Sequence, residues 1–166
     1  MISNTVISLL VAMFIVTGAC SANNGRTNSA QDSVTVNNHA TPDRKTKTRM
    51  NIQIGDTVLT ATLADNSSVD ALLDVLKQSP ITIHMKDYGN MEKVGPFGRS
   101  FPRNDTQITT QAGDLILYQG NAFVIYYAPN SWNFTRLGKI DTITADELKS
   151  ILGDGNVTVT LSLPKK

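Results

Sequence analysis

The sequence is poor in the residue types that usually carry disulfide and metal chemistry. It holds one cysteine, Cys20, and two histidines, His39 and His84, in 166 residues. A single cysteine excludes an intramolecular disulfide, so the folded part must depend on its hydrophobic core. No second histidine or cysteine stands at metal-ligand spacing from either histidine, and no glycine-rich phosphate loop is found. We therefore expect neither a metal nor another cofactor.

Charge is also sparse. Charged residues make up 17% of the chain, and the formal net charge is +1. Proteins that bind nucleic acid need a strongly basic surface to neutralise phosphates, so nucleic acid is excluded as a partner. The chain is 40% hydrophobic, which is enough for one core, and its length fits a single domain.

No hydrophobic run is long enough to span a membrane. The apolar stretch over residues 6–19 falls short of the roughly 20 residues that a transmembrane helix needs. It ends in Gly18 and Ala19 directly before Cys20, which resembles the lipobox of bacterial lipoproteins, where the signal is removed and the cysteine acylated. We therefore expect a signal peptide over 1–19, a lipid on Cys20, and attachment to a membrane of the bacterial cell envelope.

Ordinary signal cleavage is the alternative for this segment. The triplet Cys20-Ser21-Ala22 has the small-x-small form of a signal-peptidase site, and cleavage there would release a secreted or periplasmic protein without lipid. Two features favour this alternative. Residues 1–5 contain no Lys or Arg, and Thr17 stands where lipoprotein signals usually have Leu.

Residues 20–48 are expected to form a disordered tether. Asn, Ser, Thr, Ala, Gln and Lys dominate the segment, and Val34 and Val36 are nearly its only large apolar residues. Such a composition cannot bury enough apolar surface to offset the entropy of ordering. A flexible chain of this length spans about 30 Å, enough to hold a folded domain over residues 49–166 clear of a lipid surface.

Within that domain, apolar and polar residues alternate with the period of β-strands. Residues 50–54 and 58–63 flank Gly55 and Asp56, which predicts a hairpin with a glycine-first tight turn. Further strands are predicted over 81–85, 115–118, 122–127, 132–137 and 157–161. The continuous apolar runs 115–118 and 122–127 predict a hairpin that is buried on both faces.

Two helices are predicted between the strands. One begins after Asp65 or Asn66, carries apolar residues at helical spacing, and ends before Ser79. The other opens at the capping box Thr144–Glu147 and stops at Gly153. Because the strands dominate and do not alternate regularly with helices, the order predicts a mainly β fold, an antiparallel β-barrel with two capping helices.

Regular periodicity disappears between Asp87 and Gly113, where Gly and Pro recur, so we expect a long structured loop or a broken strand. Asp87 and Glu92 fall in this segment, where carboxylates are normally solvated. Long loops inside compact domains are often functional. Together with aromatic residues of the neighbouring strands, this loop supplies the candidate ligand-binding residues Phe97, Arg99, Phe101, Arg103, Tyr118, Tyr126 and Trp132. The competing interpretation is core or rim packing for the strand aromatics and solvent exposure for the arginines.

Four segments, taken in order, resemble the small bacterial proteins known as cyclophilin-like fold proteins. They are residues 51–63, residues 85–95, the pair Gly113-Asp114 before an apolar strand, and residues 136–140. The match extends over about residues 50–163. It implies the cyclophilin barrel, an antiparallel β-barrel capped by two helices.

The resemblance leaves the function open, because fold does not fix function. We expect a binding module for a peptide segment or a small ligand. A peptidyl-prolyl isomerase is the first alternative, and it would need an arginine to stabilise the twisted amide. Cyclophilins carry a Phe-His-Arg signature, whereas this chain has Phe97-Gly98-Arg99 and then Arg103. A structural subunit of an envelope complex is the second alternative.

Overall fold

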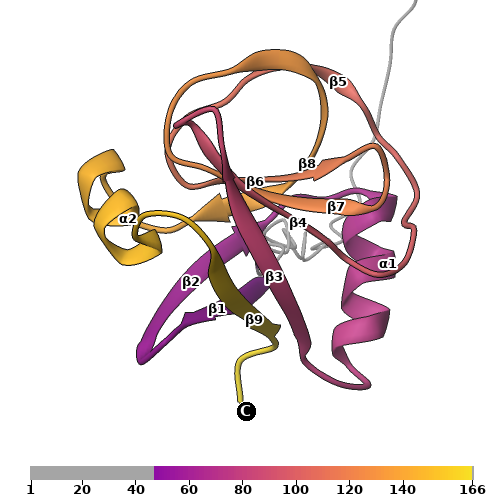
Figure 1. Cartoon of the computed structure of the whole chain (residues 1–166). Helices are drawn as coiled ribbons and strands as arrows, with labels where there is room; N and C mark the ends of the chain where they lie inside the picture. Colours follow the sequence, from indigo (N-terminus) through magenta and orange to yellow (C-terminus); the bar gives the residue numbers. More distant parts are fainter. Residues whose placement is uncertain (1–46, 166) are drawn as a thin grey trace, which may run out of the picture. The chain divides into compact units, whose positions relative to one another are not determined.

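The computed structural model describes residues 47–165, which fold into nine strands and two helices (Figure 1). The expected signal peptide, Cys20 and nearly all of the expected tether lie outside the described residues. The elements in chain order are β1 (Arg49–Ile54), β2 (Thr57–Leu63), α1 (Ser67–Leu76), β3 (Ile81–Tyr88), β4 (Glu92–Pro96), β5 (Thr106–Thr109), β6 (Asp114–Tyr118), β7 (Ala122–Tyr126), β8 (Ser131–Ile140), α2 (Ala145–Leu152) and β9 (Val157–Ser162).

Eight of the strands close into an antiparallel barrel. Their order is β2-β1-β9-β3-β4-β7-β6-β8, and β8 pairs again with β2 to complete the ring. The first and last strands of the domain are therefore neighbours, with Ile52 opposite Leu161. Closure removes the exposed edges of these eight strands. Strand β5 lies outside the ring and pairs with β8 alone among the described strands.

The barrel core follows from the alternation along each strand. Met50, Ile52 and Ile54 of β1 face inward, and the intervening residues are more exposed. The two helices lie on opposite sides of the barrel in Figure 1, and each adds apolar residues to the same core, as Leu72 and Leu148 illustrate. The mainly β barrel with two helices is thus confirmed.

Local signals for turns and helix ends are also confirmed. Gly55 adopts a φ of 55° in the tight β1–β2 turn, a conformation that glycine tolerates without steric cost. The side chain of Asn66 accepts a hydrogen bond from the Val69 amide at 3.0 Å and caps α1. Thr144 and Glu147 form the expected capping box of α2.

The expectation of a long loop over residues 87–113 is only partly correct. Strand β3 continues to Tyr88, and the segment contains two strands, β4 and β5, so it is closer to the broken-strand interpretation. Strand β4 is hidden in the sequence because Gly95 and Pro96 interrupt its apolar pattern. The glycine is required by packing, since a Cβ at this position would lie 2.5 Å from the carbonyl oxygen of His84.

A buried lysine joins β4 to the chain that follows α2. Lys93 is 1% exposed, and its Nζ donates hydrogen bonds to Asp87 Oδ2 at 2.8 Å, Gly153 O at 2.7 Å and Gly155 O at 2.8 Å. The Tyr127 hydroxyl donates to the same oxygen of Asp87 at 2.8 Å. The hydrogen bond from Lys93, opposed by burial, lowers the pKa of the Asp87 carboxyl.

Candidate functional site

A second hydrophobic cluster lies on the outer face of the barrel wall. Residues alternate along β6 and β7, so that Leu115 and Phe123 enter the main core while Ile116, Val124 and Tyr126 face the other way. Phe134 of β8 completes this outer cluster, with its ring 5.6 Å from that of Tyr126 between centroids. When a barrel strand carries apolar residues on both faces, its outer face must be covered by other side chains or by a ligand.

The cover is incomplete and leaves a groove of about 410 Å³. Its lining is mainly aromatic and apolar, with two polar groups. The lining residues are Tyr88, Glu92, Val94, Tyr118, Tyr126, Asn130, Trp132 and Phe134. Trp132 is 62% exposed and Tyr88 is 65% exposed, so two large rings stand in solvent beside the groove. A concave apolar site of this size with a few polar groups is typical of ligand pockets.

Glu92 is the acidic group of the groove. The antiparallel register places it between Tyr88 of β3 and Tyr126 of β7. Glu92 is only 8% exposed, and burial raises the pKa of its carboxyl, although a hydrogen bond from the Tyr126 hydroxyl opposes this shift. Burial and the adjacent Glu92 raise the pKa of Tyr126, so that its hydroxyl stays protonated and serves as donor.

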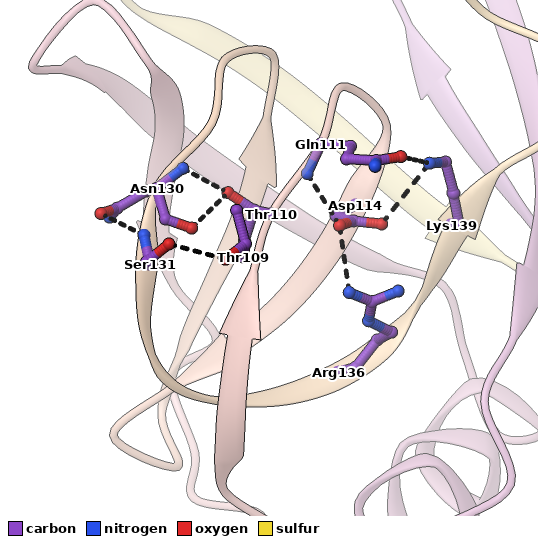
Figure 2. A network of polar contacts seen from close by, with 8 residues as sticks. All are labelled: Thr109, Thr110, Gln111, Asp114, Asn130, Ser131, Arg136 and Lys139. Atoms are coloured by element: carbon purple, nitrogen blue, oxygen red, sulfur yellow. Dashed lines mark hydrogen bonds and ion pairs between the residues drawn. The ribbon is translucent and has the colours of Figure 1, made fainter.

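Asn130 reaches the groove from a loop that is fixed by side-chain hydrogen bonds (Figure 2). The Thr110 hydroxyl accepts from the Asn130 amide at 2.9 Å, and the Thr110 amide donates to the Asn130 carbonyl at 2.7 Å. The side chain of Asn130 accepts from the Ser131 amide at 2.8 Å and donates to the Tyr126 hydroxyl at 3.2 Å. Asn130 therefore fixes the Tyr126 hydroxyl beside Glu92.

The comparisons with known proteins agree with this architecture. A family model described as the Cyclophilin-like family matches residues 52–162. The chain belongs to this family. The solution structure of a hypothetical protein from Archaeoglobus fulgidus is similar to this cyclophilin-like domain, with a TM-score of 0.53 and 12% sequence identity, over 75% of this chain and 100% of the archaeal one. At that identity the likeness shows the fold alone. No curated protein matches the sequence.

The cyclophilin-like barrel brings together three of the residues expected to contact a ligand. Tyr118, Tyr126 and Trp132 all line the groove. Tyr126 is also packed in the outer cluster. From the sequence, ligand contact and packing were alternatives for this residue, and in the structure it both packs and lines the groove.

The two candidate phenylalanines lie elsewhere. Phe97 and Phe101 are buried in the main core, 4.9 Å apart between ring centroids, and Phe97 lies 5.4 Å from Phe123. The loop that carries them folds back over the barrel because these rings supply core contacts. Their rings are therefore not available to a ligand in this structure.

The two candidate arginines are exposed and separate from the groove. Arg103 lines a neighbouring cavity of about 640 Å³, whose wall it shares with Tyr118 and Trp132 of the groove. Its guanidinium is paired with the Asp105 carboxylate. Arg99 lies in an exposed bend that lines neither cavity.

Several groove residues were not predicted from the sequence. Glu92 was expected to be solvated with Asp87, and the structure corrects both, because Glu92 lies on the buried side of the groove and Asp87 binds Lys93. Tyr88 and Phe134 were not proposed as site residues. The signal that could have found Glu92 is its alternation with Lys93 and Val94, which places it on the same face of one strand as Val94.

A second buried carboxylate, that of Asp114, lies beside the Thr110–Asn130 contacts and has a structural role (Figure 2). Asp114 is 1% exposed and accepts from the Gln111 amide at 2.9 Å and from Arg136 at 3.2 Å. Lys139 lies 3.9 Å from its other oxygen. These contacts span the irregularity in the β6–β8 register beside Leu115 and fix the loop before β6.

The described residues contain neither a metal-binding cluster nor a membrane-spanning helix. Within residues 47–165, no three His, Cys, Asp or Glu side chains meet in a group that could hold a metal ion. Of the helices in this range, none has the length and hydrophobicity to cross a membrane. His84 faces outward as expected, with its Nδ1 2.9 Å from the Thr158 hydroxyl.

Proposed function

We propose that the cyclophilin-like domain is a binding module that takes an apolar group of a peptide segment or of a small ligand into the groove beside Trp132. The observation that carries this proposal is the exposure of Trp132 and Tyr88 next to an apolar groove. Apolar surface that stays in water costs about 25 cal/mol per Å² relative to burial. Exposed apolar patches with polar rims commonly mark interaction sites.

Trp132 also supplies the test, because it is the single tryptophan of the chain. Titration of the full chain with short peptides that carry apolar side chains should produce a saturable change in tryptophan fluorescence. Replacing a groove ring, as in Tyr88→Ser, should weaken binding. Val58→Ser is the matched control, because Val58 is an exposed apolar residue of β2 that does not line the groove. No saturable change with any peptide, or equal effects of the two variants, would contradict the proposal.

Peptidyl-prolyl isomerisation is the second candidate function, and the position of Arg103 favours it. Arg103 lines a cavity that adjoins the groove through Tyr118 and Trp132, so a peptide across both could meet aromatic rings and a cation. A protease-coupled isomerisation assay tests this idea. Acceleration that is lost in Arg103→Ala and kept in Arg99→Ala would support isomerase activity with Arg103 in the site.

For the location of the domain, we propose that a lipid on Cys20 holds it at a membrane of the bacterial cell envelope. The support is the sequence Gly18-Ala19-Cys20 behind a short apolar run. Incorporation of labelled palmitate into the full chain, and its loss in Cys20→Ser, are expected. Secretion of an unlabelled protein would instead indicate the alternative cleavage after Ala22.

A further inference from the structure

Glu92 is a buried carboxyl that has no cationic partner among residues 47–165. It is less than one-tenth exposed, and none of the ion pairs among residues 47–165 includes it. The other two buried charged groups of the described residues, Lys93 and Asp114, both have partners of opposite charge. Buried charges in proteins are normally paired, because an isolated one is costly to desolvate. Glu92 therefore stands in a site that lacks a positive charge.

The groove around Glu92 is built from aromatic rings and contains no basic side chain. Five of its eight lining residues are aromatic, and Glu92 is the one charged residue among the eight. The faces of aromatic rings are electron-rich and attract cations, most strongly when the cation is desolvated. The carboxylate of Glu92 and the aromatic walls of the groove therefore both attract cations.

We propose that the groove binds the quaternary ammonium group of a small molecule, with Glu92 as counter-ion and the aromatic rings as walls. This inference rests on the proposed binding function and names the chemical class of its ligand. The volume of about 410 Å³ lies within the range of small-molecule sites.

The hydrogen bonds already made in the groove favour a quaternary ammonium over a primary one, because each neutral side-chain oxygen has one of its two lone pairs in use. A primary ammonium brings three N–H donors that all need acceptors when they leave water. The side-chain oxygen of Asn130 already accepts from the Ser131 amide, and the Tyr126 hydroxyl accepts from Asn130. The Tyr118 hydroxyl accepts from Gln119. A quaternary ammonium has no N–H donor, so Glu92 alone can balance it.

The test compares choline with dimethylbutanol, the uncharged analogue in which carbon replaces nitrogen. Tryptophan fluorescence of the full chain reports binding of both at constant ionic strength and at about pH 8, well above the ordinary pKa of a glutamate carboxyl. Choline should bind at least about tenfold more tightly than dimethylbutanol. Glu92→Gln keeps the shape of the side chain and should weaken choline binding about tenfold, with dimethylbutanol binding unchanged.

Two further variants separate the effect of Glu92 from that of net charge and test the aromatic wall. Asp56→Asn removes one negative charge from the exposed β1–β2 turn, outside the groove, and should leave choline binding unchanged. Tyr88→Leu keeps an apolar side chain and should reduce the preference for choline over dimethylbutanol. Equal binding of the two compounds, or full choline affinity in Glu92→Gln, would overturn the inference and leave the proposed function intact. If choline, dimethylbutanol and apolar peptides all fail to bind, the proposed function itself is wrong.

Discussion

The buried lysine of β4 offers a direct test of how the barrel is held together. Lys93→Met keeps an unbranched apolar stem that is one atom shorter and removes the charge and the three donors of the ammonium group. The Asp87 carboxylate and the carbonyls of Gly153 and Gly155 then lose a partner that lies 2.7 to 2.8 Å away. Removing one partner of a buried ion pair costs about 3–5 kcal/mol. Because the Asp87 side chain is 28% exposed, water can solvate it in part, so we expect about 3 kcal/mol.

Chemical denaturation of the full chain, monitored by Trp132 fluorescence, measures this loss. In thermal unfolding, the melting temperature should fall by about 10 °C or more. Lys77→Met is the matched control, because Lys77 pairs with Asp74 on α1 at 2.8 Å with both side chains exposed. Exposed pairs contribute less than about 1 kcal/mol.

A double variant separates charge from packing at this site. Lys93→Met combined with Asp87→Asn removes the carboxylate that the single change leaves unpaired, so it should recover part of the lost stability. Equal stability of Lys93→Met and Lys77→Met, or a double variant less stable than Lys93→Met alone, would contradict a stabilising buried ion pair.

Three further predictions concern stability. The hydrogen bond from Lys93 lowers the pKa of Asp87, so ionised Asp87 stabilises the fold above the ordinary pKa of 3.8. This stabilisation is lost as pH falls through the lower pKa of the folded state. The free energy of unfolding should therefore fall less steeply with acid in Asp87→Asn. Gly95→Ala should cost about 2 kcal/mol by thermal denaturation, because the new Cβ would lie 2.5 Å from the carbonyl oxygen of His84. Burial raises the pKa of Glu92, so ionisation of this group opposes folding, and Glu92→Gln should raise the free energy of unfolding at neutral pH. That gain should vanish below the ordinary value of 4.5, where the wild-type group is protonated in both states. A variant that gains no stability at neutral pH would argue against burial of an ionised Glu92.

Local patterns in the sequence predict the elements whose chemistry is contained in a few neighbouring residues. The β1–β2 hairpin follows from alternation around Gly55, and α2 follows from the capping box at Thr144. Both depend on backbone geometry over short distances, so they do not need knowledge of the fold. The barrel topology follows from the order of such elements and from the resemblance to cyclophilin-like proteins.

The groove is harder to predict because distant strands build it. Glu92 is buried since β3 and β7 flank it with Tyr88 and Tyr126, and no local pattern reveals either neighbour. Phe97 and Phe101 were predicted to be accessible to a ligand, because a segment rich in Gly and Pro indicates a surface loop. Both rings are instead buried in the core. Burial in these cases is a tertiary property.

Mapping of ligand contacts by NMR tests the binding site most directly. Amide and indole resonances of the full chain would be followed during titration with a saturating ligand found by fluorescence. The shifts should concentrate on Tyr88, Glu92, Tyr118 and Trp132, which line the groove. Resonances of Arg99 should stay unchanged. Shifts that cluster on another face of the barrel and spare the Trp132 indole would contradict the assignment of the groove as the binding site.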